Sequence, residues 1–143
     1  MIADMTTPLY TASAASTGDA RNGHVQTTDG LLEVDVRVPQ AMGGPGGATN
    51  PEQLFAAGYA ACFHQAIKLV AGRAQADATD SEVVADVTIH DNGQGGFLLS
   101  AQLEVTLPNV DEATARELVE QAHQVCPYSN ATRGNIEVTL TVA

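Results

Sequence analysis

Hydrophobic residues alternate with polar residues over several stretches of this chain, which is the pattern of β-strands with one buried side. Residues 32–38 alternate strictly and end at Pro39, and residues 136–142 alternate in the same way. Residues 84–90 and 97–107 predict two further strands, joined by a glycine-rich hairpin loop. The expected buried row of the second of these strands consists of Leu99, Ala101, Leu103, Val105 and Leu107.

The N-terminal part of the chain predicts a β-hairpin. Residues 9–16 have a strand pattern with many small side chains, and a second stretch of strand follows at residues 24–28. The segment between them, residues 18–23, has the sequence GDARNG and the composition of a turn. We therefore expect Arg21 at the tip of this hairpin.

A long apolar helix is predicted from residue 51 to about residue 72. Asn50 can cap its first turn, Pro51 suits the first helical position, and Glu52 lies near the positive end of the helix dipole. Residues 54–67 are apolar on nearly every side, which is typical of a helix that is buried on most faces. In so small a chain, this burial is easiest to satisfy if a partner subunit covers one side of the helix.

A second helix is predicted from a cap at Asp111 through Val125. Its apolar residues form one stripe at helical spacing: Ala115, Leu118, Ala122 and Val125. The resulting order of elements is β-β-β-α-β-β-α-β, which predicts an α+β fold dominated by antiparallel strand pairs. A length of 143 residues fits a single domain, residues 1–143.

The charge of the chain excludes some classes of partner. The sequence has 6 Lys and Arg against 17 Asp and Glu, a formal net charge of -11. Such a surface repels phosphate backbones and anionic lipid headgroups, so neither nucleic acid nor a membrane is an expected partner. The first residues lack the basic region of a secretory signal, and we expect no segment to reach the roughly 20 apolar residues that span a bilayer. We therefore expect a cytoplasmic protein.

The candidate chemistry depends on the two cysteines of the chain, Cys62 and Cys126. Cys62 lies within the apolar helix, and Cys126 lies where the second helix meets Pro127. If the fold brings them together, they form a dithiol that can cycle between reduced and oxidised states. In a reducing compartment, a structural disulfide is the less expected use of such a pair. If the fold keeps them apart, they are two small core side chains.

A reactive Cys62 needs a cation nearby, because only the thiolate attacks and an apolar setting raises the pKa of a thiol. Arg21 is one of the 6 basic residues that could supply it, and Glu52 could hold the guanidinium through a bidentate contact. Glu52 and Cys62 are ten residues apart, which separates their backbones by about 15 Å along one helix. Either Arg21 spans this gap, or an antiparallel crossing in a two-fold dimer supplies Glu52 from the neighbouring subunit. The sequence leaves both arrangements open.

Three other interpretations of the same residues have to be weighed. Cys62, His64, His123 and Cys126 are side chains of the kinds that bind zinc, but Cys62 and His64 are two residues apart and do not share a helix face. A cysteine hydrolase in which His64 or His123 activates Cys62 lacks a recognisable nucleophile turn and leaves Cys126 without a role. The simplest alternative is that both cysteines only fill the core.

Two longer motifs favour a redox role for the cysteines over these three alternatives. Residues 49–63 have the sequence TNPEQLFAAGYAACF, and residues 126–136 have the sequence CPYSNATRGNI. With the ARNG segment around Arg21 and the glycine-rich loop at residues 43–47, they follow the order of the organic hydroperoxide resistance (Ohr) family of OsmC-like proteins. The resemblance covers essentially the whole chain, and the second motif resembles the Ohr branch rather than the OsmC branch. The one departure is the lead at residues 1–5, which bears on nothing catalytic.

The resemblance implies both a fold and an activity. The fold would be an α+β, OsmC/Ohr-like fold, in which antiparallel sheets pack around long central apolar helices in an intertwined homodimer. The activity would be that of a thiol peroxidase, in which Cys62 attacks an organic hydroperoxide, including those of fatty acids, and becomes a sulfenic acid. Cys126 would resolve this sulfenic acid to a disulfide, while Arg21 activates the Cys62 thiolate and Glu52 anchors Arg21.

The resemblance also implies the partners of the reaction. A dithiol donor, dihydrolipoamide or a lipoylated protein, would reduce the disulfide, so that neither a metal nor a bound cofactor is needed. Two alternatives stay open: an OsmC-type peroxidase with a different substrate preference, and a non-enzymatic acidic α+β dimer whose cysteines only pack.

Overall fold

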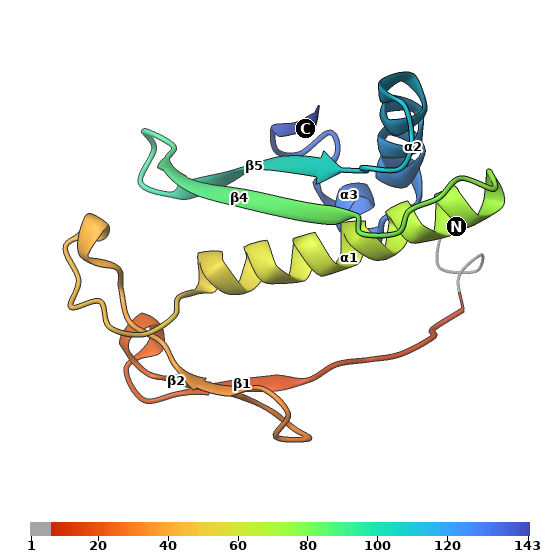
Figure 1. Ribbon diagram of the computed structural model, residues 1–143. Helices are drawn as coiled ribbons and strands as arrows, with labels where there is room; N and C mark the ends of the chain where they lie inside the picture. The colour runs from red at the N-terminus through yellow and green to blue at the C-terminus, as the bar shows by residue number, and fades with distance from the viewer. Residues whose placement is uncertain (1–6) are drawn as a thin grey trace. The chain divides into compact units, whose positions relative to one another are not determined.

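The structure is a computed structural model that describes residues 7–143, and the lead at residues 1–5 lies outside the described residues. The chain forms two compact units, one that ends at Pro51 and one that runs from Glu52 to Ala143. Figure 1 shows the helices and strands of both units. The expectation of a single domain stays a prediction.

The N-terminal unit is built on an antiparallel sheet in the order β1-β2-β3. Its strands are β1 Ala14–Thr17, β2 His24–Thr27 and β3 Glu33–Asp35. The expected hairpin is confirmed, since Thr17 pairs with His24 and Arg21 lies between the strands, in the 3-10 turn η2 Ala20–Asn22. The first strand is shorter than predicted because its pairing with β2 begins only at Ala14.

The turn that carries Arg21 is held by contacts within its own unit. Gly23 closes the turn, because a Cβ atom at this position would lie 2.3 Å from the carbonyl oxygen of Thr17. The Arg37 guanidinium donates hydrogen bonds to the carbonyl oxygens of Asn22 and Gly23, at 3.1 and 2.9 Å. These contacts fix the backbone that follows Arg21, and they give Arg37 a structural role.

The third strand is shorter than the alternation at residues 32–38 predicts. β3 pairs with β2 only from Glu33 to Asp35, and Val36 continues as an isolated parallel bridge to Thr49. Val36 is 2% exposed and Leu32 is 40% exposed, so the hydrophobic residues of the alternating stretch are buried over only part of its length. An alternating pattern thus marked the strand correctly but overestimated its extent.

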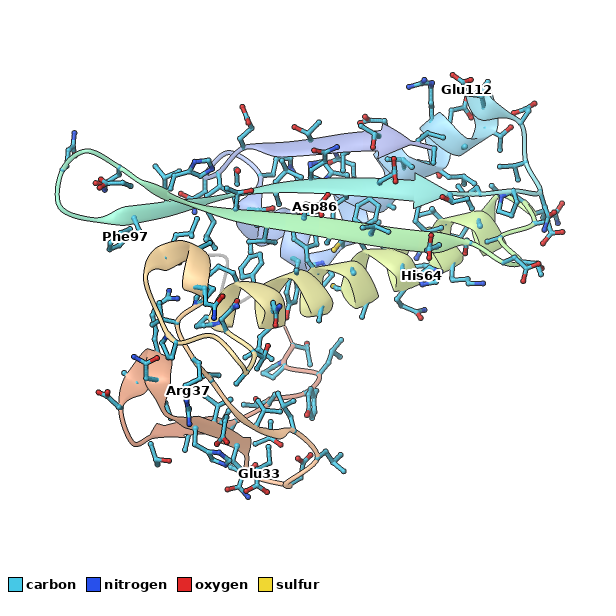
Figure 2. All side chains as sticks on the ribbon, turned by 60° about the vertical axis from the view of Figure 1, so that its left-hand side comes forward. Glu33, Arg37, His64, Asp86, Phe97 and Glu112 are labelled. Atoms are coloured by element: carbon cyan, nitrogen blue, oxygen red, sulfur yellow. The ribbon has the colours of Figure 1, made fainter. Side chains whose placement is uncertain are left out.

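The C-terminal unit contains the long helix and a second sheet. Its elements are α1 Pro51–Arg73, β4 Glu82–Asp91, β5 Phe97–Thr106, α2 Glu112–Val125, α3 Pro127–Thr132 and β6 Val138–Val142. β4 and β5 form the expected antiparallel hairpin, with Phe97 near its tip (Figure 2), and β6 adds to β5 in parallel. Asp111 caps α2 by accepting a hydrogen bond from the Thr114 N–H at 2.7 Å, as the sequence predicts.

Helices α1 and α2 share one hydrophobic core with this sheet, along which α1 runs in Figure 1. The fully buried members from the two helices and β5 include Tyr59, Phe63, Ile67, Leu103, Val105 and Leu118. The predicted buried row of β5 is confirmed from Ala101 to Leu107, whereas Leu99 is partly exposed. Burial of each large apolar side chain contributes roughly 1.5–3 kcal/mol, so this core holds the two helices firmly against the sheet.

Helix α1 is long and apolar enough to cross a membrane, judged by length and composition alone. It has 23 residues, and the mean hydropathy of its most apolar window is 1.3. The expectation that no segment is long and apolar enough to span a bilayer is therefore wrong. Polar residues such as Gln65 and Lys68 interrupt the run of apolar residues, but the mean hydropathy of the helix stays high. The buried core helix of a soluble protein passes the same test, so the finding is weak evidence for a membrane span.

One face of α1 carries exposed apolar residues in the described chain. Ala57, Ala61 and Leu69 are exposed and lie in one row at a spacing of four or eight residues, which they share with the exposed Gln53 and Gln65. A helix this apolar is thus not covered on every side by its own chain. The expectation that a partner subunit covers one side of it stays a prediction.

Candidate active site

The two cysteines, which are 64 residues apart in the sequence, meet inside the C-terminal unit. The Sγ atoms of Cys62 and Cys126 lie 3.4 Å apart, and both cysteines are free thiols. Cys126 is completely buried, and Cys62 is partly exposed. Since a disulfide bond is about 2.0 Å long, the two sulfur atoms need to approach by only about 1.4 Å to form one.

Cys126 stands at the junction of α2 and α3. Its N–H donates to the carbonyl oxygen of Ala122 at 2.9 Å, which closes α2, and its own backbone is extended. Pro127 then occupies the first position of α3, where the missing N–H costs nothing. Helix α3 is not among the elements predicted from the sequence, because Pro127 indicates the end of the preceding helix as readily as the start of a new one.

Backbone N–H groups from the first turn of α3 reach both sulfur atoms. The Ser129 N–H donates to Cys126 Sγ at 3.5 Å, so the thiol caps the helix. The Tyr128 N–H donates to the Cys62 sulfur. The first turn of α3 therefore positions both thiols.

The surroundings of Cys62 disfavour its charged form. Burial raises the pKa of the Cys62 thiol above its ordinary value, the Tyr128 N–H lowers it, and the neighbouring Cys126 raises it further. The Cys126 sulfur lies only 3.4 Å away, so negative charge on it disfavours the thiolate form of Cys62. A reactive Cys62 thus requires a cation, as the apolar sequence around Cys62 predicts.

An aromatic cluster flanks Cys62 on the N-terminal half of α1. Tyr59 packs edge-on against Phe55 and Phe63. The centroids of the Tyr59 and Tyr128 rings are 5.7 Å apart. Gly58 lets Tyr128 lie close to the helix, because a Cβ atom there would be 2.9 Å from the Tyr128 hydroxyl oxygen. The cluster gives the surroundings of Cys62 an apolar character. Tyr59 and Phe63 are buried core residues.

The buried hydroxyl of Tyr59 connects α1 to α3. Its oxygen forms hydrogen bonds with Ser129 Oγ at 2.8 Å and with Thr132 Oγ1 at 3.0 Å. Ser129 and Thr132 are themselves buried. A tyrosine in an apolar helix needs a partner for its hydroxyl, and this requirement is the signal in the sequence that points to such a contact.

The other two predicted site residues lie apart from the sulfur pair in the chain. Glu52 is in the first turn of α1, ten residues and about 15 Å along the helix axis from Cys62. Arg21 belongs to the N-terminal unit, in η2. The structure therefore brings Cys62 and Cys126 together, and the roles of Arg21 and Glu52 stay predictions.

The histidines are not arranged as a zinc site or a hydrolase would require. His64, labelled in Figure 2, forms a hydrogen bond through Nε2 with Ser81 Oγ at 2.9 Å. His123 has a buried Nδ1 without a hydrogen-bond partner in the described chain, and burial, followed by the charge of Arg133, lowers its pKa. Within residues 7–143, no group of three or more His, Cys, Asp or Glu side chains is placed to hold a metal ion.

Comparison with a model of the OsmC-like protein family gives a match over residues 44–141. The chain is also similar to an organic hydroperoxide resistance protein of Xanthomonas axonopodis pv. citri (strain 306). The two are 50% identical over 138 residues, which cover 94% of this chain and 95% of the relative. The aligned regions include both cysteine motifs and nearly all of the described elements.

Solved structures show the same similarity in three dimensions. An organic hydroperoxide resistance protein from Legionella pneumophila has a TM-score of 0.92 at 48% identity, and the match covers 96% of this chain and 99% of that one. A second such protein, from Elizabethkingia anophelis, has a TM-score of 0.91 at 50% identity, again over 96% and 99% of the two chains. The α+β fold expected from the sequence is thereby confirmed.

Proposed function

This chain belongs to the organic hydroperoxide resistance branch of the OsmC-like protein family, and from that membership we propose that it is a thiol-dependent peroxidase. Its substrates would be organic hydroperoxides, including those of fatty acids, and its products the corresponding alcohols. The observation that supports this most directly is the 3.4 Å separation of two free thiols in an apolar setting.

The first step is the attack of the Cys62 thiolate on the peroxide. The sulfur forms a bond to one peroxide oxygen as the O–O bond breaks, and the other oxygen leaves and takes up a proton to become the alcohol. Cys62 is thereby oxidised to a sulfenic acid. Cys62 fits this role because it is the partly exposed member of the pair, whereas Cys126 is completely buried.

The second step is the condensation of the two cysteines. Cys126 attacks the sulfur of the Cys62 sulfenic acid, a disulfide forms, and the oxygen leaves as water. The two sulfur atoms start 3.4 Å apart, one on α1 and one at the junction of α2 and α3, so the step needs no large movement of the chain. A thiol held this close competes effectively with thiols from solution.

The third step returns the disulfide to two thiols. We propose a dithiol of the lipoyl kind, dihydrolipoamide or a lipoylated protein, which gives two electrons and two protons to Cys62 and Cys126 and becomes a cyclic disulfide. The chain would need neither a metal nor a bound cofactor for this cycle. Its place of action would be the cytoplasm, where such donors are kept reduced.

The cation that the Cys62 thiolate needs would be Arg21, anchored by Glu52. A guanidinium beside the sulfur favours the thiolate and offsets the effect of burial on the Cys62 pKa. A bidentate contact with a carboxylate leaves other N–H groups of the guanidinium free to face the sulfur. In an intertwined homodimer, which the exposed apolar residues of α1 favour, either subunit would supply the carboxylate.

Replacing Arg21 by alanine should move the pH profile of peroxide attack to higher pH. Loss of a neighbouring cation raises the pKa of the Cys62 thiol, and each unit of rise leaves about tenfold less thiolate at a pH below the pKa. We expect the rate at pH 7 to fall by about tenfold or more and to recover partly in alkaline solution. Stopped-flow measurement of thiol oxidation between pH 5 and about 10 checks this.

Two variants serve as controls for the Arg21→Ala result. Arg116→Ala removes an exposed arginine that pairs with Glu112, and it should leave the pH profile unchanged. Glu52→Gln should reproduce part of the Arg21→Ala effect, and it should add little to that effect in the double variant. Glu112→Gln, which also changes a glutamate in a first helical turn, should have no effect on the pH profile. An unchanged profile in Arg21→Ala would assign the cation to another residue.

Steady-state turnover tests the proposed function as a whole. The assay would compare dihydrolipoamide with reduced thioredoxin as donor, each with tert-butyl hydroperoxide and with hydrogen peroxide. We expect the fastest turnover with dihydrolipoamide and the organic peroxide, because the aromatic cluster favours an apolar substrate. Faster turnover of hydrogen peroxide would indicate an OsmC-type peroxidase of different preference, and no turnover with any pair would favour a non-enzymatic dimer.

A further inference from the structure

The hydroxyl of Tyr59 is a contact between the helix that carries Cys62 and the helix that begins at Cys126. Tyr59 lies three residues before Cys62 on α1, and its ring is completely buried. The hydroxyl oxygen lies 2.8 Å from Ser129 Oγ and 3.0 Å from Thr132 Oγ1. It therefore touches α3 both in its first turn and at its last residue.

Helix α3 depends on such outside contacts for its position. It has 6 residues, from Pro127 to Thr132, and a helix of this length has little stability of its own in water. Ser129 and Thr132 are the buried residues of this helix, and both bind the Tyr59 hydroxyl. A buried hydrogen-bonded group of this kind fixes a single arrangement of the elements that it joins.

Helix α3 contributes to the geometry of the two thiols, because backbone groups of its first turn contact both sulfur atoms. The Tyr128 N–H faces the Cys62 sulfur, and the Ser129 N–H donates to the Cys126 sulfur at 3.5 Å. Ser129 thus contacts Tyr59 through its side chain and Cys126 through its backbone. A tilt of α3 would move both amides, and with them the 3.4 Å contact of the two sulfur atoms.

We propose that Tyr59 is a positioning residue for the redox pair, which holds α3 so that Cys62 and Cys126 stay within bonding reach of each other. It acts through Ser129 and Thr132 and does not touch the peroxide. The inference builds on the proposed function for its effect on turnover, but the effect on disulfide formation follows from the geometry of the pair alone.

The test is Tyr59→Phe, which keeps the buried ring and removes the hydroxyl. One measurement equilibrates the protein with mixtures of reduced and oxidised dithiothreitol and determines the equilibrium constant of the internal disulfide. A second follows the conversion of the Cys62 sulfenic acid to the disulfide after one equivalent of tert-butyl hydroperoxide. We expect both the equilibrium constant and the rate to fall by about tenfold, the effect of losing one or two ordinary hydrogen bonds.

Matched variants separate positioning from a general loss of stability. Thr141→Val removes a buried hydroxyl of the same unit that has no hydrogen-bond partner in the described chain, and it should leave both quantities unchanged. Ser129→Ala should reproduce part of the Tyr59→Phe effect, because Thr132 still binds the hydroxyl. The double variant should be little worse than Tyr59→Phe alone, since the contact with Ser129 is already lost in that variant.

Tyr59→Phe values equal to those of Thr141→Val would overturn the proposal. A lower melting temperature without a change in the equilibrium constant would overturn it as well, because the hydroxyl would then only stabilise the fold. If the wild-type protein forms the disulfide in dithiothreitol mixtures but consumes no peroxide, the peroxidase proposal fails, and the equilibrium constants of the variants still decide the role of Tyr59.

Discussion

Replacing Cys62 by serine is expected to abolish peroxide consumption. A serine hydroxyl is not ionised near neutral pH and is a far weaker nucleophile toward a peroxide oxygen than a thiolate is. The remaining thiol, Cys126, is completely buried and cannot take over the attack without a rearrangement. The rate of loss of tert-butyl hydroperoxide in the presence of dihydrolipoamide should fall to that of the donor alone.

The serine variant is close in size to the parent, so folding should be retained and can be checked by circular dichroism and melting temperature. Lys68→Ala is a useful control on the same helix, because Lys68 donates to the carbonyl oxygen of Ala78 and lies outside the sulfur pair. It should consume peroxide at the wild-type rate. Activity retained in Cys62→Ser would show that the nucleophile is misassigned.

The second large effect is expected from Cys126→Ser. The first attack should proceed at a rate within a few-fold of the wild type, because Cys62 and its neighbours in the aromatic cluster are unchanged. The sulfenic acid at Cys62 should then accumulate, since the thiol that lies 3.4 Å away in the wild type is gone. A dimedone-type probe should label Cys62 in this variant and hardly at all in the wild type.

Turnover of Cys126→Ser with a dithiol donor should fall by about tenfold or more, because a bimolecular reaction replaces the intramolecular step. Mass spectrometry of the probe adduct and a single-turnover assay separate the two effects. Equal labelling of Cys62 in the variant and the wild type would mean that Cys126 does not resolve the sulfenic acid. Disulfides between two chains in the wild type would point to the same conclusion.

Local signals in the sequence predicted most of the secondary structure, because they act over a few residues. The cap at Asp111 and the proline at the start of α1 placed both long helices within a residue or two of their observed bounds. The glycine-rich loop between β4 and β5 likewise predicted that hairpin. Strand ends were less well predicted, since the length of β3 depends on the residues of β2 that are available to pair with it.

Helix α3 illustrates how one residue type can carry two opposite signals. Proline ends a helix that precedes it and also suits the first turn of one that follows. At Pro127 both hold, because α2 ends at Val125 and α3 begins at Pro127 itself. The side chain of Cys126 then completes the junction by capping α3, a contact that a pattern of hydrophobic residues does not encode.

The candidate site depended more on long-range contacts than the elements did. Nothing local in the sequence requires Cys62 and Cys126 to meet across 64 residues, and the resemblance to a known family supplied that expectation. The contact of Tyr59 with Ser129, across 70 residues, has no local signal beyond the need of a buried hydroxyl for a partner. The proposed roles of Arg21 and Glu52 also come from the resemblance and await the variants described above.

Thiol titration after a single equivalent of peroxide tests the central claim most directly. The reduced protein would be mixed with one equivalent of tert-butyl hydroperoxide, its free thiols counted, and its peptides mapped without reduction. The proposed cycle predicts the loss of both thiols, with one disulfide that links Cys62 to Cys126 in the same chain. Two thiols that remain unreacted under these conditions would contradict it.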